Sequence, residues 1–233
     1  AHELRTPLTN LRGYLEAVRD GVVEARGEVI DSLYEEAMLL SQLVEDLQDL
    51  SLSDAGRLSL RREPVELGDA LFAAAQALRP RARAQGIEIM LEVGSALPSV
   101  LADRQRVGQI LRNLLSNAVT YTAAGGQIVV SAAARDGDVR VEVRDTGSGI
   151  APEHLPNVFE RFYRADPSRT RATGGAGIGL AVVKQLVEAH GGSVAITSVP
   201  GQGTCVSFTL PCPERRTPSH AAAHPRAGTA ARS

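Results

Sequence analysis

Residues 141–150 have the sequence VEVRDTGSGI, and this stretch changes character halfway along. Its first part alternates apolar and polar side chains, which is typical of a β-strand with one buried face. The strand ends at Asp145, and Gly147 and Gly149 then let the backbone turn tightly and approach a ligand closely. A carboxylate in this place can accept a hydrogen bond from the exocyclic amine of adenine. Taken alone, however, Asp-x-Gly-x-Gly is more often a plain strand-ending turn.

The segments around this stretch alternate between helical and strand periods. Asp103 is a typical N-cap, and Asp136-Gly137-Asp138 and Pro200-Gly201 are turn sequences between strands. We expect residues 61–64 to form a linker. Alternating helices and strands predict an α/β sandwich whose mixed or antiparallel sheet is covered by helices on one face. The predicted helices span 67–85, 103–122 and 177–190, and the predicted strands span 87–93, 128–134, 139–144, 194–199 and 204–210.

The first fifty residues have a different pattern, with apolar side chains at alternating steps of three and four. This 3.5-residue period is typical of helices that pack as coiled coils. Residues 20–27 contain two glycines and separate the two runs, so we expect an antiparallel helical hairpin. A hairpin alone leaves much of its apolar surface exposed to solvent. We therefore favour burial by a second copy in a four-helix bundle over folding back onto the rest of the chain. The two seams are Leu4, Leu8, Leu11, Leu15, Val18 and Val22, and Ile30, Leu33, Ala37, Leu40, Val44, Leu47 and Ser51.

Composition excludes several classes of protein. With 233 residues, 43% of them hydrophobic, and a formal net charge of −2, the chain is ordinary for a soluble globular protein. It gives no reason to expect nucleic acid or lipid as the main partner. The two cysteines, Cys205 and Cys212, lack further ligands at metal-binding spacing, so we expect reduced thiols in the cytoplasm. No apolar run approaches the ~18 residues that span a bilayer. Because the chain lacks an initiator Met, we expect a fragment of a longer protein, with a disordered tail over 214–233.

Two asparagines, Asn113 and Asn117, lie four residues apart in the predicted helix 103–122 and therefore on one of its faces. A neutral amide oxygen can ligate Mg²⁺ without adding negative charge beside a triphosphate. The alternative is a polar stripe that faces only solvent.

A glycine-rich segment, GGAGIGL at residues 174–180, leads directly into the last predicted helix. Backbone N–H groups at a helix N-terminus bind phosphates. The segment lacks the Lys-Ser/Thr ending of a P-loop, and no strand leads into it as a dinucleotide-binding turn requires. A polar stretch before it predicts a mobile lid whose cations reach phosphates, although a solvated loop remains the alternative for the last two arginines. These cations are Arg161, Arg164, Arg169 and Arg171.

Near the start, residues 2–8 have the sequence HELRTPL. A neutral imidazole nitrogen, here on His2, is suited to attack phosphorus near neutral pH. Glu3 can accept the other ring N–H or take up its proton, and Thr6 lies one helical turn from His2. In a competing reading, Thr6 is an N-cap and Pro7 the first residue of a helix, which leaves His2 in a frayed terminus.

Together and in this order, these motifs resemble the catalytic core of bacterial two-component sensor histidine kinases. The resemblance covers about residues 1–211 and rests on several ordered motifs. These are the phosphoacceptor box at 2–8, the asparagine box at 113–117, the first glycine box at 145–149, the phenylalanine box at 159–164, the second glycine box at 175–180 and a glycine-rich turn at 201–204.

The resemblance implies an α+β architecture: a two-helix hairpin that dimerises into a four-helix bundle, followed by an α/β sandwich ATPase domain of the histidine kinase/gyrase type. We expect a dimerisation and phosphotransfer domain at 1–60, an ATP-binding domain at 61–213 and a tail beyond. His2 would accept the γ-phosphoryl group of ATP with Glu3 as acid–base partner, and Thr6 would serve dephosphorylation of the partner, a response regulator receiver domain. Pro7 would lie inside a continuous helix. Attachment to a membrane would come only through an upstream region, as in inner-membrane sensors.

For the nucleotide, the resemblance implies ATP and Mg²⁺. Asn117 would ligate the metal, and Asn113 would support the metal and the phosphates. Asp145 would bind the adenine amine. The other matched residues would line the nucleotide: Gly147 and Gly149 at the base, Tyr121 near the adenine, Arg164 near the γ-phosphate, and Gly175, Gly177, Gly179 and the adjoining Leu180 at the phosphates.

One residue departs from the family pattern: Thr120 stands where many members have a lysine that faces the phosphates. Two other functions stay open. An ATPase of the gyrase or mismatch-repair type uses a Glu base on the asparagine helix, but residues 107–122 contain neither Glu nor Asp. The second open function is a dimerisation and docking module that binds nucleotide without transferring phosphate.

Overall fold

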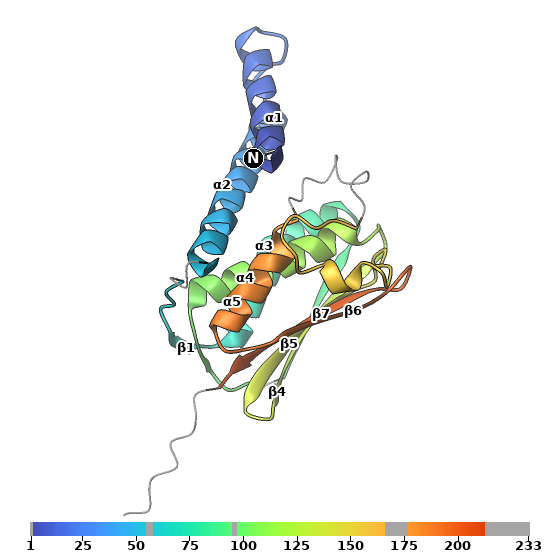
Figure 1. The fold of residues 1–233 in the computed structure, drawn as a ribbon. Coiled ribbons are helices and arrows are strands. Elements are labelled where there is room, and N and C mark those ends of the chain that lie inside the picture. Colours follow the sequence, from blue (N-terminus) through green and yellow to red (C-terminus); the bar gives the residue numbers. More distant parts are fainter. Residues whose placement is uncertain (1, 55–57, 95–96, 166–176, 213–233) are drawn as a thin grey trace, which may run out of the picture.

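The computed structural model describes residues 2–54, 58–94, 97–165 and 177–212. It consists of a helical hairpin that projects from an α/β domain (Figure 1). None of the helices within these ranges is long and apolar enough to cross a bilayer. In chain order the elements are α1 (His2–Arg19), α2 (Gly27–Asp54), β1 (Glu63–Val65), α3 (Leu67–Ala84), β2 (Glu88–Val93), β3 (Val100–Ala102), α4 (Arg104–Tyr121), β4 (Gln127–Arg135), β5 (Asp138–Asp145), the 3₁₀ turn η1 (Leu155–Asn157), α5 (Gly179–Ala189), β6 (Val194–Val199) and β7 (Gly203–Pro211).

The main sheet has five strands in the order β2-β4-β5-β7-β6, with β2 and β4 parallel and the other pairs antiparallel. The helices α3, α4 and α5 cover one face (Figure 1). This is the mixed, one-side-covered sheet that the sequence predicts. The β4–β5 turn places Asp136 at φ 51° and Gly137 at φ 90°, which are the left-handed conformations that a tight hairpin needs.

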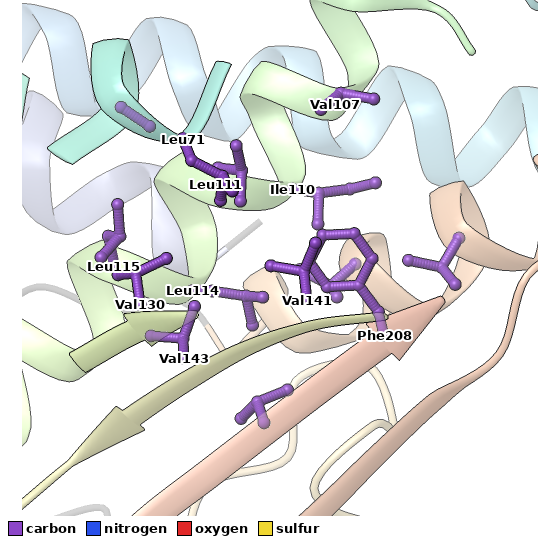
Figure 2. Close-up of a cluster of buried hydrophobic side chains, with 14 of the residues drawn as sticks. Leu71, Val107, Ile110, Leu111, Leu114, Leu115, Val130, Val141, Val143 and Phe208 are labelled. Carbon is purple, nitrogen blue, oxygen red and sulfur yellow. The ribbon is translucent and has the colours of Figure 1, made fainter. Parts of the chain in front are cut away.

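The core lies between the helices and the covered face of the sheet. One side of α4 supplies seven of its side chains, and β4, β5 and β7 supply the opposing layer (Figure 2). Phe208 is 1% exposed and fills the space beneath α4. Because this side of α4 is fixed by burial, its other side is held open to solvent. The core residues of α4 are Val107, Ile110, Leu111, Leu114, Leu115, Ala118 and Val119.

A second, two-stranded sheet corrects the expected linker at 61–64. Glu63–Val65 forms β1, which pairs antiparallel with β3, a strand that the sequence analysis did not predict. Val65 and Val100 are both fully buried, so apolar burial together with the ladder stabilises these short strands.

The helix α1 begins at His2 and continues through Pro7, so the reading of Thr6 as an N-cap is wrong. Proline removes one N–H that would bond the carbonyl four residues earlier, and this loss falls close to the helix end. The other end of α1 is at Arg19, so Val22 lies in the turn and not on the seam where the sequence analysis placed it.

The hairpin contacts the α/β domain through the second half of α2. Leu43 and Leu50 are buried in the common core, and between them Asp46 and Asp49 are only 3% and 4% exposed. Both carboxylates accept hydrogen bonds of 2.9 Å from Nε2 of Gln109 on α4. Arg106 of α4 pairs with Asp49. We call Asp46, Asp49, Arg106 and Gln109 the α2–α4 polar cluster. This end of α2 thus folds onto its own chain, while the seam farther up stays open: Leu8, Leu15 and Ile30 are 57%, 50% and 51% exposed.

Candidate functional site

The open side of α4 carries the two asparagines. Asp103 caps this helix, because its Oδ1 accepts hydrogen bonds from the N–H groups of Gln105 and Arg106. Asn113 is half-buried, and its Nδ2 lies 3.5 Å from the carbonyl oxygen of Gly179 at the start of α5. Asn117 is half-buried one turn farther on, and within the described ranges its amide makes no hydrogen bond. Its oxygen is therefore available to a ligand.

Asp145, the last residue of β5, is 9% exposed. Its Oδ1 accepts hydrogen bonds from the N–H groups of Gly147 at 2.8 Å and Thr204 at 3.2 Å. No donor among the described residues bonds Oδ2. Burial raises the pKa of Asp145, and the two N–H groups act in the opposite direction. The arrangement fixes the carboxylate by one oxygen and leaves the other for a donor such as an adenine amine.

The turn after Asp145 packs directly on the end of α4. The N–H of Ser148 donates to the carbonyl oxygen of Tyr121 at 3.1 Å. A Cβ at Gly147 would collide with that same carbonyl and come within 2.8 Å of Asp145 Oδ1. Gly149 has φ +67° and lies against the backbone of Val199. Only glycine permits both approaches. The first brings the asparagine helix and the Asp145 turn together, and the second sets the turn against the end of β6.

The segment before α5 meets the phenylalanine box. The N–H of Phe162 donates to the carbonyl oxygen of Gly177 at 2.9 Å. Gly177 has φ +68°, and a Cβ there would lie 2.8 Å from the Tyr163 carbonyl oxygen and 3.2 Å from Cγ of Arg164. Arg164 is half-buried at this junction. Leu180 packs against the core and anchors the first turn of α5. The rest of the predicted lid, including Arg169, Arg171 and Gly175, lies outside the described residues.

The structure therefore brings together most of the predicted nucleotide residues. They lie on α4, at the turn after β5, in the phenylalanine-box segment and at the start of α5: Asn113, Asn117, Tyr121, Asp145, Gly147, Gly149, Arg164, Gly177, Gly179 and Leu180. His2, Glu3 and Thr6 are on the first turns of α1, in a different part of the molecule, and their side chains lie outside what the structure describes.

A contact that the sequence analysis missed joins α3 to the open side of α4. Arg81 Nη1 lies 3.5 Å from Ser116 Oγ, and Nη2 lies 3.4 Å from Thr120 Oγ1. An arginine in the last turn of a helix normally indicates only compensation of the helix dipole, so the sequence carries no signal for this contact.

The donor set suits a metal held jointly with phosphates. Among the described residues no group of three or more His, Cys, Asp or Glu side chains forms a metal cage. Mg²⁺ usually keeps its waters and substrate phosphates and takes only one or two protein ligands. A single amide oxygen, as on Asn117, is compatible with that chemistry.

Comparison with known proteins assigns the helical hairpin and the α/β domain to two different families. Residues 1–56 match the His Kinase A (phospho-acceptor) domain, and residues 102–214 match the histidine kinase-, DNA gyrase B- and HSP90-like ATPase family. The chain is 41% identical over 211 residues to the signal transduction histidine-protein kinase BaeS of Escherichia coli K12, covering 91% of this chain and 45% of BaeS. It thus spans less than half the length of that relative.

Solved structures of histidine kinases also resemble the chain. The mycobacterial sensor histidine kinase MprB is 31% identical with a TM-score of 0.56, over 64% of this chain and 97% of that one. Full-length ShkA, solved in complex with AMPPNP, is 38% identical with a TM-score of 0.68, over 81% of this chain and 39% of that one. With a phosphoacceptor helix, an asparagine helix and glycine turns in one order and one fold, the chain belongs to the sensor histidine kinases of two-component systems.

Proposed function

We propose that this chain transfers the γ-phosphoryl group of ATP to His2 and then to an aspartate on a response regulator receiver domain. The observation that carries the proposal is the packing of the turn after Asp145 on the end of the helix that carries Asn117. Each of these two residues has a side-chain oxygen that no described donor uses. An adenine amine and a metal–phosphate group are the two ends of one ATP molecule. Membership in the family and the AMPPNP complex of ShkA support the same ligand.

In the proposed complex, Asp145 accepts the adenine amine while Tyr121, Gly147 and Gly149 border the base. Asn117 would hold Mg²⁺, whose charge would offset that of the phosphates, and Asn113 would support the metal. Arg164 and the backbone at the start of α5 face the phosphates, where the N–H groups and the helix dipole favour negative charge. The resemblance assigns phosphate contacts to Gly175 as well, which lies outside the described residues.

The transfer is an in-line displacement. A ring nitrogen of His2 forms a bond to the γ-phosphorus as the bond to the bridging oxygen breaks, and ADP leaves. Glu3 takes up the imidazole proton. The phosphohistidine then passes the phosphoryl group to the carboxylate of the receiver aspartate. In the opposing activity, hydrolysis of the phosphoaspartate, Thr6 positions the attacking water. Because ATP is a cytoplasmic metabolite, we place both domains in the cytoplasm.

A homodimer is part of the proposal. The open leucine seam of the hairpin gives a second copy an apolar face to cover, and histidine kinases dimerise through this domain. The four-helix bundle also presents the surface on which the receiver domain docks.

Incubation of the purified chain with γ-³²P-ATP and Mg²⁺ tests the function. We expect acid-labile, alkali-stable label on the wild type, none on His2→Gln, and none on Asp145→Asn because the base is no longer bound. Circular dichroism checks that both variants fold. Label that persists on His2→Gln would remove His2 from its role. Normal ATP binding without any label would leave a docking module that binds nucleotide.

A further inference from the structure

The open side of α4 is neutral along the positions that border the asparagines. Ser116 and Thr120 lie three residues after Asn113 and Asn117, respectively, so on a helix they are immediate neighbours. None of the four carries a charge. A triphosphate bound along residues 113–120 brings several negative charges, and this stretch of α4 has no cation of its own to meet them.

Arg81 brings such a cation from α3. Its two terminal nitrogens straddle the Ser116 and Thr120 hydroxyls at 3.5 and 3.4 Å, which places the guanidinium over α4 beside the asparagine row. Both bonds are long and exposed, so the hydroxyls orient the group without neutralising it. A guanidinium has five N–H donors, and these two contacts leave most of them for another acceptor.

Arg81 differs from the two arginines of the first turn of α4 in its partners. Arg104 faces Glu63, and Arg106 faces Asp49. In the described part of the chain, Arg81 makes no ion pair with a carboxylate. A surface cation that is oriented by hydroxyls and has no carboxylate beside it is available to an anion.

We propose that Arg81 is a positioning residue for the phosphates of the nucleotide, acting across α4 from the side opposite Arg164. The proposal rests on the nucleotide site inferred above and adds a residue from α3, an element outside every motif of the resemblance. The group that Arg81 recognises is the β- or γ-phosphate of an adenine nucleotide. In this proposal, Arg81 makes no contact with the adenine base.

The test measures dissociation constants by calorimetry for Mg·ADP, Mg·AMPPNP and adenosine on the full chain. For Arg81→Gln we expect about fivefold weaker binding of the two nucleotides, which is the range of an exposed charge pair, and unchanged binding of adenosine. At high salt the difference in affinity between the wild type and Arg81→Gln should shrink, because salt screens the attraction between Arg81 and the phosphates in the wild type. Arg83→Gln is the matched control, since it removes an exposed arginine of the same helix that has no described contact with α4.

A second variant keeps the test decisive. Adding Thr120→Lys to Arg81→Gln puts a cation back on α4 itself, and we expect it to restore nucleotide affinity. The proposal is overturned if Arg81→Gln binds both nucleotides as the wild type does, or if adenosine binding falls by the same factor. A wild type that binds no nucleotide at all would instead overturn the proposed function.

Discussion

His190 lies fully buried at the end of α5 and joins that helix to the N-cap of α4. Its Nε2 accepts a hydrogen bond of 3.0 Å from the Asp103 N–H, so Nδ1 carries the proton that is shared with the Leu186 carbonyl oxygen at 2.6 Å. Burial lowers the pKa of His190 below 6.5, and Arg62 and Arg106 lower it further, while the Leu186 carbonyl and Asp103 act in the opposite direction. The ring is thus neutral in the folded protein.

This neutrality predicts a pH dependence of stability. As pH falls below 6.5, the unfolded chain takes up a proton at His190 before the folded chain does, so the free energy of unfolding decreases. The slope from this one group approaches about 1.4 kcal/mol per pH unit until the folded pKa is passed. Urea denaturation across this window checks it. His190→Gln should lower stability by about 1–3 kcal/mol at neutral pH, because its partners are less well satisfied, and should flatten the slope. An unchanged slope would assign the pH dependence elsewhere.

At the scale of elements, local patterns predict much of the fold and miss what depends on distant partners. The period of residues 141–145 and the turn at Asp136-Gly137 correctly predict β5 and its hairpin with β4. The strands β1 and β3 have three residues each, too few to show a period, and they exist because they pair across a gap in sequence.

In the candidate site, too, some features can be predicted from local sequence and others depend on packing between distant elements. Glycines at 147, 149 and 177 are visible in the sequence, and the structure shows a close backbone approach at each. The contact of Arg81 with α4 depends on how two helices pack, and no local pattern reports it.

The hairpin yields a prediction about assembly. Leu15 lies midway along the α1 seam and is 50% exposed in the single chain. Burying it in a bundle stabilises each copy by about 1.5–3 kcal/mol, and a carboxylate there reverses the effect. We expect Leu15→Glu to weaken the dimer at least about 100-fold. Sedimentation equilibrium over a concentration series measures it.

Val22→Glu is the control for this substitution. It places the same charge in the turn beyond α1, where Val22 is 77% exposed, and we expect the dimer to persist. If Leu15→Glu self-associates as strongly as the wild type, the leucine seam is not the dimer interface.

At the scale of the whole molecule, the two domains are joined by polar groups as well as by leucines. Asp46 and Asp49 occur on α2 in a stretch rich in acids, and such a stretch normally indicates a solvated helix face. Their burial becomes apparent only with Arg106 and Gln109, about sixty residues away along the chain. In the proposed function, the nucleotide must reach His2 on α1, so the α2–α4 polar cluster bears on how firmly the ATP-binding domain is held relative to the hairpin.

Removing Asp49 should loosen that hold. Asp49→Ala leaves the Arg106 guanidinium and one bond of the buried Gln109 amide without their acceptor, and breaking such a buried pair costs up to about 3–5 kcal/mol. We expect less here, because the Arg106 side chain is 26% exposed. For Asp49→Ala we expect a larger radius of gyration in small-angle X-ray scattering, while each domain stays folded.

Arg104 lies on the same helix as Arg106, and Arg104→Ala breaks only an exposed pair with Glu63 of β1, so it should leave the radius unchanged. Asp49→Ala combined with Arg106→Met should expand the molecule less than the sum of the two single changes, since both remove one interaction. Full additivity, or an unchanged radius for Asp49→Ala, would show that the apolar contacts of Leu43 and Leu50 hold the domains by themselves.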